Sequence, residues 1–252
     1  MKKILVANWK MNPVSVAEAV ALAKKSERAA AAFSNAEVVV APPTPFLIPV
    51  ARVLKKARLA SQNVFWEDAG PYTGEVSVPQ LKSVGASHVI IGHSERKIHL
   101  GETDGMIAKK VAAAADAGIT VILCIGEEER DGDEIPAIVG EQFMGALAGI
   151  RKNAMKNIIV CYEPVWAIST MSGARPCSPD DVFRAAVYIR KMISVRFGRT
   201  AAHATRIVYG GSVGSENIAS YFTQGAVEGA LIGGASLVPG EFRRIVEIVS
   251  AL

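Results

Sequence analysis

The chain has 252 residues, half of them hydrophobic, and a formal net charge of +4 at pH 7. This composition suits one large α/β domain with a sizeable core and excludes a disordered protein, and no apolar stretch is long enough to span a membrane. Lysine and arginine are scattered and aromatic residues are few, so nucleic-acid binding is weakly supported, whereas a small anionic substrate suits the mild positive charge.

Eight strand-like apolar runs alternate with segments of helical spacing. The basic N-terminus has only four apolar residues before Asn8, too few for the core of a signal peptide, so it is predicted to open the first strand. The predicted strands are Ile4–Asn8, Glu37–Ala41, Leu59–Gln62, His88–Gly92, Thr120–Cys124, Asn157–Tyr162, Thr205–Tyr209 and Gly229–Ile232.

Helix-start signals follow several of these strands. Ser15, with Glu18 three residues later, has the capping-box pattern and predicts a helix over Ala19–Ala32. Ser178 before Pro179 and a pair of aspartates combines an N-cap, a first-turn proline and acids at the positive end of a helix. Further starts are predicted at Thr103–Asp104 and Ser215–Glu216.

Eight β-then-α units with near-continuous apolar strands indicate a parallel sheet covered by helices. Eight units in roughly 250 residues match a closed (β/α)8 barrel of the α/β class better than an open doubly wound sheet. The segment Asn8–Asn12 stands where a dinucleotide-binding fold carries its glycine-rich fingerprint, which further disfavours the open sheet. No linker divides the chain, so residues 1–252 are predicted to form a single barrel domain.

The cysteines Cys124, Cys161 and Cys177 are odd in number and form no CxxC pair. They are more typical of reduced thiols in a cytoplasmic protein than of a disulfide framework or a zinc site. No His/Cys/Asp cluster has metal-ligand spacing, so neither a metal nor another cofactor is expected.

The apolar run Ile158–Tyr162 ends abruptly in Glu163, and Pro164 prevents the strand from simply continuing. Alone, such a carboxylate is more often a local cap than a catalytic group. In a parallel barrel, however, side chains at the carboxyl ends of the strands become neighbours, and active sites are built there. Glu163 would then share one rim with polar side chains from other strand ends, which are Asn8, Lys10, His93 and Glu95.

Two diglycine loops, Tyr209–Val213 and Gly233–Leu237, follow the predicted seventh and eighth strands. Glycine lets backbone N–H groups approach an anion, and loops at these places in a barrel frequently hold phosphate. Either loop alone is equally consistent with a flexible turn. Together they favour a phosphate-binding site.

Several motifs of the chain, taken in order, resemble the triosephosphate isomerase family, and the resemblance covers essentially the whole chain. The strings around Glu163 and His93 are highly specific to that family, whereas the glycine loops are less so. The motifs are Asn8-x-Lys10, Gly92–Arg96, Cys124–Glu127, Tyr162–Ile168, Tyr209–Val213 and Gly233–Ser236. The resemblance implies a TIM barrel that interconverts dihydroxyacetone phosphate and D-glyceraldehyde 3-phosphate through an enediolate, in glycolysis and gluconeogenesis.

The resemblance also implies a role for each residue on the rim. Glu163 would be the base that moves a proton between two substrate carbons, and His93, neutral, would donate to the carbonyl oxygens. Lys10 would stabilise negative charge, Asn8 would help to fix the substrate oxygens, and Glu95 would orient Lys10. These roles suit proton abstraction next to a carbonyl, which needs a desolvated carboxylate and preplaced donors.

By the same resemblance, the substrate phosphate would lie on the N–H groups of Ser212, Gly233 and Gly234, with Ser169 closing over it. Residues 164–177 would form a lid that excludes water from the reaction.

The closed lid would be latched by Tyr209 and Ser212, with Gly173 and Ala174 as partners. Cys124 and Trp166 are predicted to pack rather than react.

The chain departs from the family pattern in its lid. Ser169 and Met171 replace the expected glycines, and about two residues are inserted before the next helix. Non-glycine residues restrict the backbone, so lid closure is expected to follow a different path. Two ion pairs are also implied, Arg96 with Glu102, and Arg190 with Glu228 in place of the usual aspartate.

A loop over residues 63–77 resembles the protruding loop through which this family forms homodimers, with Thr73 near the partner's site. The loop carries Phe65, Trp66 and Tyr72, and exposed aromatic residues at that density indicate an interface.

Two other functions are weighed against the isomerase. A barrel isomerase acting on a larger phosphorylated sugar would use the phosphate loops, but it leaves the strings around His93 and Glu163 unexplained. A barrel retained for binding without catalysis is disfavoured because Asn8, Lys10, His93 and Glu163 are all present.

Overall fold

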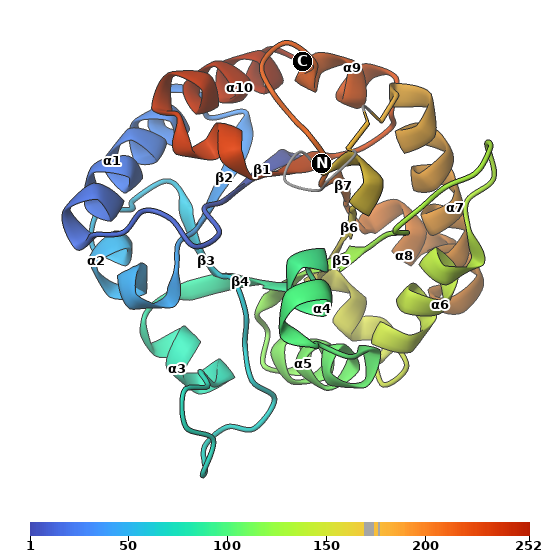
Figure 1. Cartoon of the computed structure of the whole chain (residues 1–252), viewed down its shortest axis with the longest axis horizontal. Coiled ribbons are helices and arrows are strands. Elements are labelled where there is room, and N and C mark those ends of the chain that lie inside the picture. The colour runs from blue at the N-terminus through green and yellow to red at the C-terminus, as the bar shows by residue number, and fades with distance from the viewer. Residues whose placement is uncertain (169–173, 176) are drawn as a thin grey trace.

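The strands of the computed structural model lie side by side in chain order and close into a barrel, with β8 pairing β1 and every pair parallel (Figure 1). The structure describes residues 1–168, 174–175 and 177–252. All of the predicted strands are found, with ends shifted by at most two residues, so the (β/α)8 barrel is confirmed. The strands are β1 Lys3–Asn8, β2 Ala36–Ala41, β3 Arg58–Ser61, β4 Ala86–Ile91, β5 Thr120–Ile125, β6 Ile158–Tyr162, β7 Ile207–Tyr209 and β8 Gly229–Ile232.

Helices form a ring around the outside of the barrel (Figure 1). They are α1 Val16–Ala32, α2 Leu47–Ala51, α3 Val78–Ser83, α4 Ser94–Leu100, α5 Asp104–Asp116, α6 Ala137–Ala146, α7 Pro179–Phe197, α8 Arg199–Ala204, α9 Ile218–Thr223 and α10 Pro239–Ala251. Short 3-10 turns cover Thr44–Phe46, Lys152–Asn157, Val165–Ala167 and Gly234–Leu237. Within the described ranges, every helix is too short or too polar to cross a membrane.

Both faces of the barrel strands are buried, which explains their continuous apolar runs. Side chains alternate between the barrel interior and the layer beneath the helices. The interior is filled mostly by branched residues, as expected for a packed core rather than a pore. Its members are Ile4, Val6, Val39, Ala41, Ala60, Ile90, Ile122, Cys124, Ile159, Cys161, Val208 and Leu231.

Three of the predicted helix starts are confirmed. The side chains of Ser15, Thr103 and Ser178 each accept a backbone N–H in the first turn of α1, α5 and α7. The start at Ser215–Glu216 is wrong, because α9 begins at Ile218. Ser215 instead donates its backbone N–H and its hydroxyl to the carboxylate of Glu241, at 2.6 and 3.0 Å. A contact with a distant helix thus outcompetes the local cap.

A group of charged side chains lies at the amino ends of the strands, opposite the predicted active site. Arg206 Nη1 donates to Glu37 Oε2 at 2.6 Å, and His88 Nε2 lies 3.8 Å from Glu37 Oε1. Burial lowers the pKa of His88 from 6.5 to about 4, although the Glu37 carboxylate opposes that shift. The imidazole is therefore held neutral in the folded protein across the physiological pH range.

Candidate active site

Glu163 directly follows β6 and is held against the end of β5. Its backbone N–H donates to the Ile125 carbonyl at 2.8 Å, and the Val165 N–H donates to the Glu127 carbonyl at 2.9 Å. A Cβ on Gly126 would lie 1.9 Å from the Glu163 carbonyl oxygen, so only glycine allows this approach. Glu163, the candidate base, therefore lies where the pairing of β5 with β6 continues beyond the two strands.

The Glu163 carboxylate is 3 % exposed and is bound by two groups from the end of β4. Ser94 N–H donates to its Oε2 at 2.9 Å, and His93 Nε2 lies 3.0 Å from its Oε1. Glu95 N–H donates to His93 Nδ1 at 3.2 Å, so that nitrogen carries no proton. The network therefore assigns a neutral imidazole whose Nε2–H donates to Glu163.

Lys10 enters the same rim from the loop after β1. Its ammonium lies 2.5 Å from Glu95 Oε1, and its backbone N–H donates to the Asn8 side chain at 3.0 Å. The backbone of Lys10 has a φ of 52°, a left-handed conformation that a non-glycine residue adopts at some cost. Gln62 Nε2 compensates by donating to the Lys10 carbonyl at 2.8 Å. The strained backbone aims the ammonium toward the site.

A cavity of about 230 Å³ brings the predicted residues together. Asn8, Lys10, His93 and Glu163 line it together with both glycine loops. A Cβ on Gly233 would approach Lys10 Cε to 3.3 Å, so the glycine leaves room for that side chain. The further lining residues are Ile168, Gly210, Gly211, Ser212, Val213, Glu216, Asn217, Leu231, Gly234 and Ala235.

The structure also shows site residues that were not predicted from the sequence. The Ser94 amide binds the base candidate, and Glu216 and Asn217 line the cavity. Ser94 belongs to the sequence string around His93, which points to the site. Nothing in the neighbouring sequence, however, indicates that its backbone N–H would donate to Glu163. Ser212 lies where it was expected, yet its N–H and its hydroxyl both donate to the Ala167 carbonyl, at 3.2 and 2.8 Å.

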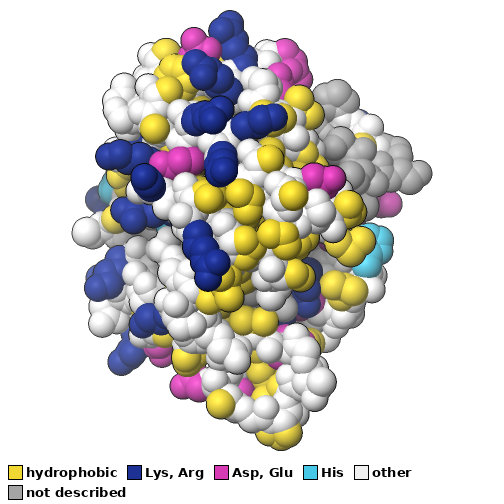
Figure 2. Space-filling view, turned by 90° about the vertical axis from the view of Figure 1, so that its left-hand side faces the viewer, with side chains coloured by type: hydrophobic (Ala, Val, Ile, Leu, Met, Phe, Trp, Pro, Cys, Tyr) yellow, Lys and Arg dark blue, Asp and Glu magenta, His cyan; other side chains and the backbone are white. Residues whose placement is uncertain are grey.

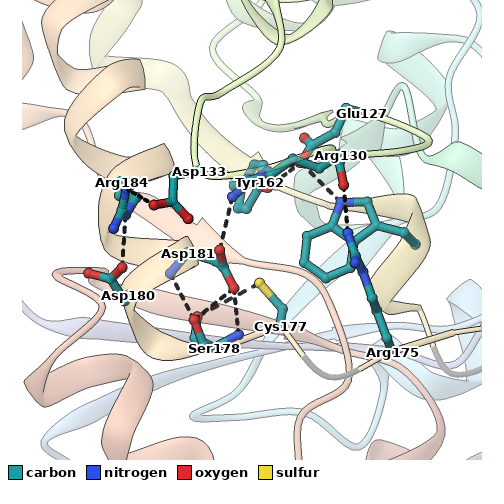
Figure 3. Close-up of polar contacts among 11 residues, drawn as sticks. Glu127, Arg130, Asp133, Tyr162, Arg175, Cys177, Ser178, Asp180, Asp181 and Arg184 are labelled. Carbon is teal, nitrogen blue, oxygen red and sulfur yellow. Dashed lines mark hydrogen bonds and ion pairs between the residues drawn. The ribbon is translucent and has the colours of Figure 1, made fainter.

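A buried polar network supports the chain on both sides of Glu163 (Figure 3). Glu127 Oε1 accepts hydrogen bonds from Tyr162 Oη at 2.8 Å, Arg130 Nε at 2.9 Å and Trp166 Nε1 at 3.0 Å. Arg130 also reaches Tyr162 and, at 3.2 Å, Asp181 on α7. Burial raises the pKa of the Tyr162 phenol, which therefore stays protonated. Trp166 is anchored by a hydrogen bond as well as by packing.

The predicted supporting residues lie close to this centre. Cys124 and Cys161 are paired in register on β5 and β6 inside the barrel. A hydrogen bond with Cys161, together with burial, raises the pKa of the Cys124 thiol, so it stays protonated. Tyr209 is buried at the end of β7, with its ring centroid 4.4 Å from that of Tyr221.

Both expected ion pairs are present. Arg96 Nε lies 3.2 Å from Glu102 Oε2, although the two groups are not aligned as a hydrogen bond. Glu102 is also paired with the buried Lys110. Arg190 Nη2 lies 2.7 Å from Glu228 Oε1, so the longer side chain retains the pairing expected of aspartate.

Some lid predictions lie outside the described residues, namely those on Ser169, Met171 and Gly173. In the part of the chain that is described, no group of three or more His, Cys, Asp and Glu side chains could hold a metal ion.

Comparisons with known proteins give one consistent family. The triosephosphate isomerase family model matches residues 3–249. Triosephosphate isomerase from Dictyoglomus thermophilum is 39 % identical over 250 residues, which cover 98 % of this chain and 99 % of the relative. The enzymes so named from Caldanaerobacter subterraneus subsp. tengcongensis and Geotalea uraniireducens are each 40 % identical, over 97 % of this chain and 98 % of the relative.

Proposed function

The chain belongs to the triosephosphate isomerase family and interconverts dihydroxyacetone phosphate and glyceraldehyde 3-phosphate in glycolysis, and from that premise we propose that Glu163, His93 and Lys10 are its catalytic residues. The observation that carries the proposal is the hydrogen bond between a buried carboxylate and a neutral imidazole, on the cavity wall that Lys10 shares. Proton abstraction and oxyanion stabilisation require these groups.

Glu163 removes a proton from the substrate carbon next to the carbonyl and returns it to the neighbouring carbon. Its carboxylate is shielded from water, which keeps it reactive as a base once substrate replaces its present partners. Glu163 directly follows β6 and is attached to β5 through a backbone hydrogen bond, so its position is set by the barrel itself.

His93 donates its Nε2 proton to the substrate oxygen on which negative charge develops. A neutral imidazole suits this role because the proton can pass to one oxygen and be recovered from the other. The Glu95 amide fixes the required tautomer through Nδ1.

Lys10 supplies positive charge to the enediolate and to the phosphate, and Asn8 fixes the substrate oxygens. The Glu95 carboxylate, 2.5 Å from the ammonium, orients Lys10. A fixed charge in a cavity shielded from water stabilises a developing oxyanion more strongly than the same charge in solution.

The phosphate is bound by the N–H groups of Ser212, Gly233 and Gly234. Support comes from their place in the wall of the cavity that Glu163 also lines, and from the short turn that begins at Gly234. Backbone N–H groups at such a turn favour an anion.

We also propose a homodimer formed through residues 63–77 and the adjoining apolar face. The loop protrudes from the barrel in Figure 1, and Thr73 within it is exposed. Figure 2 shows hydrophobic side chains gathered on the face that carries α1 and α2. In the segment that precedes α1, Met11 is 90 % and Val14 86 % exposed. An exposed apolar field beside a protruding loop is typical of an oligomer interface.

The aromatic residues of this loop differ from their predicted exposure. Only Tyr72 is exposed, while Phe65 and Trp66 are half-buried with ring centroids 4.0 Å apart. Phe65 also packs on Tyr72, at 4.5 Å. The three aromatic rings therefore pack against one another within the loop. Thr73 and the adjoining apolar face would make the proposed contact with the second subunit. Sedimentation at micromolar concentration tests the dimer, and a clean monomer contradicts it.

A cytoplasmic location is proposed from the thiols. Cys124, Cys161 and Cys177 are all buried, and none forms a disulfide in the described chain. Burial raises the pKa of Cys177 to about 12, so its thiol stays protonated and unreactive.

A coupled assay on glyceraldehyde 3-phosphate tests the catalytic assignment, with wild type compared to variants at Glu163, His93 and Lys10. Folded variants that keep wild-type turnover would contradict the assigned roles. A larger phosphorylated aldose, assayed in parallel, tests the alternative barrel isomerase and is expected to give no turnover. Folded wild-type protein without activity on either substrate would favour the binding protein instead.

A further inference from the structure

A guanidinium from the stretch before Ser178 holds Trp166, shortly after the proposed base. The Arg175 guanidinium carbon lies 4.6 Å from the centroid of the indole ring. Its Nη2 donates to the Arg130 carbonyl at 2.7 Å, a contact drawn in Figure 3. The backbone N–H of Arg175 donates to the Trp166 carbonyl at 3.0 Å. Arg175 therefore contacts both the ring and the backbone of Trp166.

Trp166 is connected to Glu163 by a short and restricted stretch of backbone. It lies in the 3-10 turn Val165–Ala167, and only Pro164 and Val165 separate it from Glu163. Because the proline ring fixes φ at Pro164, this short connection has little freedom to absorb a shift of the turn. A displaced indole would also break the hydrogen bond to Glu127.

The contacts of Arg175 are of moderate strength. Within the described ranges it forms no ion pair with a carboxylate, and the side chain is exposed. A cation over an aromatic ring and a hydrogen bond to a neutral carbonyl each contribute less than a buried, charge-paired contact. Such contacts can adjust the position of Trp166, whereas the buried ion pair of Glu127 and Arg130 holds the surrounding structure in place.

We propose that Arg175 is a positioning residue for the isomerase reaction, which acts by holding Trp166 and thereby sets the placement of Glu163 against His93. The inference rests on the proposed role of Glu163 as the base. It assigns a function to a residue in the stretch where this chain is longer than the family pattern.

The test combines kinetics with a signal from the indole itself. The chain has three tryptophans, so protein labelled with 5-fluorotryptophan gives one fluorine resonance for each, and W166F assigns the relevant one. R175A is expected to shift the Trp166 resonance alone and to lower kcat about three- to fivefold, with KM within a factor of about two. R175K retains a cation within reach of the ring and restores most of kcat. R151A, at a side chain 73 % exposed, is the matched control and leaves both readouts unchanged.

Each alternative result overturns the proposal in a recognisable way. An unmoved Trp166 resonance in R175A shows that Arg175 does not hold the ring. A shifted resonance with wild-type kcat shows that the ring position does not matter for the base, and a rise in KM alone assigns Arg175 to substrate binding. Wild-type protein without activity removes the proposed function as well, and that failure is distinct because it precedes any substitution.

Discussion

His93 Nε2 lies 3.0 Å from Glu163 Oε1, so the proposed acid and the proposed base meet in one hydrogen bond. A substrate that enters between them replaces a single contact with two, one from carbon to carboxylate and one from oxygen to imidazole. The same contact gives the buried Oε1 a donor, as the Ser94 N–H does for Oε2. The predictions below follow from this arrangement and from the groups that support it.

Replacing Glu163 by glutamine is expected to lower turnover by about 10² to 10⁴-fold, because it removes the base while keeping the shape of the side chain. The glutamine carbonyl can still accept from the Ser94 amide, but its NH2 group then faces the His93 Nε2–H, so the melting temperature should fall modestly while the protein stays folded. A coupled assay and a melting curve together check this. E141Q, at an exposed position on α6, is the control, and an active E163Q would exclude Glu163 as the base.

Lys10→Met is expected to lower kcat/KM by at least about 10²-fold, because the charge that stabilises the enediolate and the phosphate is lost. The methionine also leaves Glu95 without its cation, so an anionic substrate should bind more weakly. Steady-state kinetics on both triose phosphates measure the effect. K24M on the exposed side of α1 removes an equal charge and should behave as wild type, which separates the local effect from net charge.

Gly126→Ala is expected to destabilise the fold by about 1–3 kcal/mol and to lower kcat, since the new methyl group would stand 1.9 Å from the Glu163 carbonyl oxygen. The end of β6 must move to relieve that contact, and Glu163 moves with it. Urea unfolding and the coupled assay report the two effects. At Gly149 an added Cβ meets nothing within 4 Å, so G149A should stay within about 0.5 kcal/mol of wild type.

The free energy of unfolding should fall as the pH is lowered from about 6.5 toward 4. His88 has a depressed pKa of about 4 in the folded protein. Below pH 6.5 the unfolded chain therefore binds a proton at this residue, whereas the folded chain does not. Stability from this group is complete above 6.5 and is lost as the pH approaches 4, by about 2 kcal/mol between pH 7 and pH 5.

His88→Gln should remove that part of the pH dependence, even though Glu37, Arg206 and Arg58 remain around the site. Urea titrations at pH 7 and pH 5 make the comparison. H203Q, at an exposed position, should keep the wild-type difference. An unchanged difference in H88Q would mean that other groups carry the acid sensitivity.

The barrel could be predicted because each strand is buried on both faces and reads as an apolar run with a clear end. The same logic placed Glu163, His93 and Lys10 on one rim, since a parallel barrel gathers its strand ends whatever their distance in sequence. Local rules also gave the caps at Ser15 and Ser178, where the bonding partner lies three residues away.

Prediction failed where a distant partner decides the outcome. Ser215 has a capping pattern, yet the Glu241 carboxylate on α10 takes its donors. Phe65 and Trp66 look like surface aromatics in the sequence but stack on each other. Glu127 accepts hydrogen bonds from Tyr162, Arg130 and Trp166. No spacing in the sequence indicates that these three side chains meet at one carboxylate.

The amide of Ser212 donates to the Ala167 carbonyl at 3.2 Å, so the phosphate binding proposed for this amide would exchange one acceptor for another. The free energy gained there is only the difference between two hydrogen bonds, and a doubly charged phosphate is the stronger acceptor. The Ala167 carbonyl thus competes with a bound anion for the Ser212 N–H, and a weakly basic anion would displace it poorly. Because Ala167 closes the turn that follows Glu163, the proposed phosphate site would couple arrival of the charged end of the substrate to the segment that carries the proposed base.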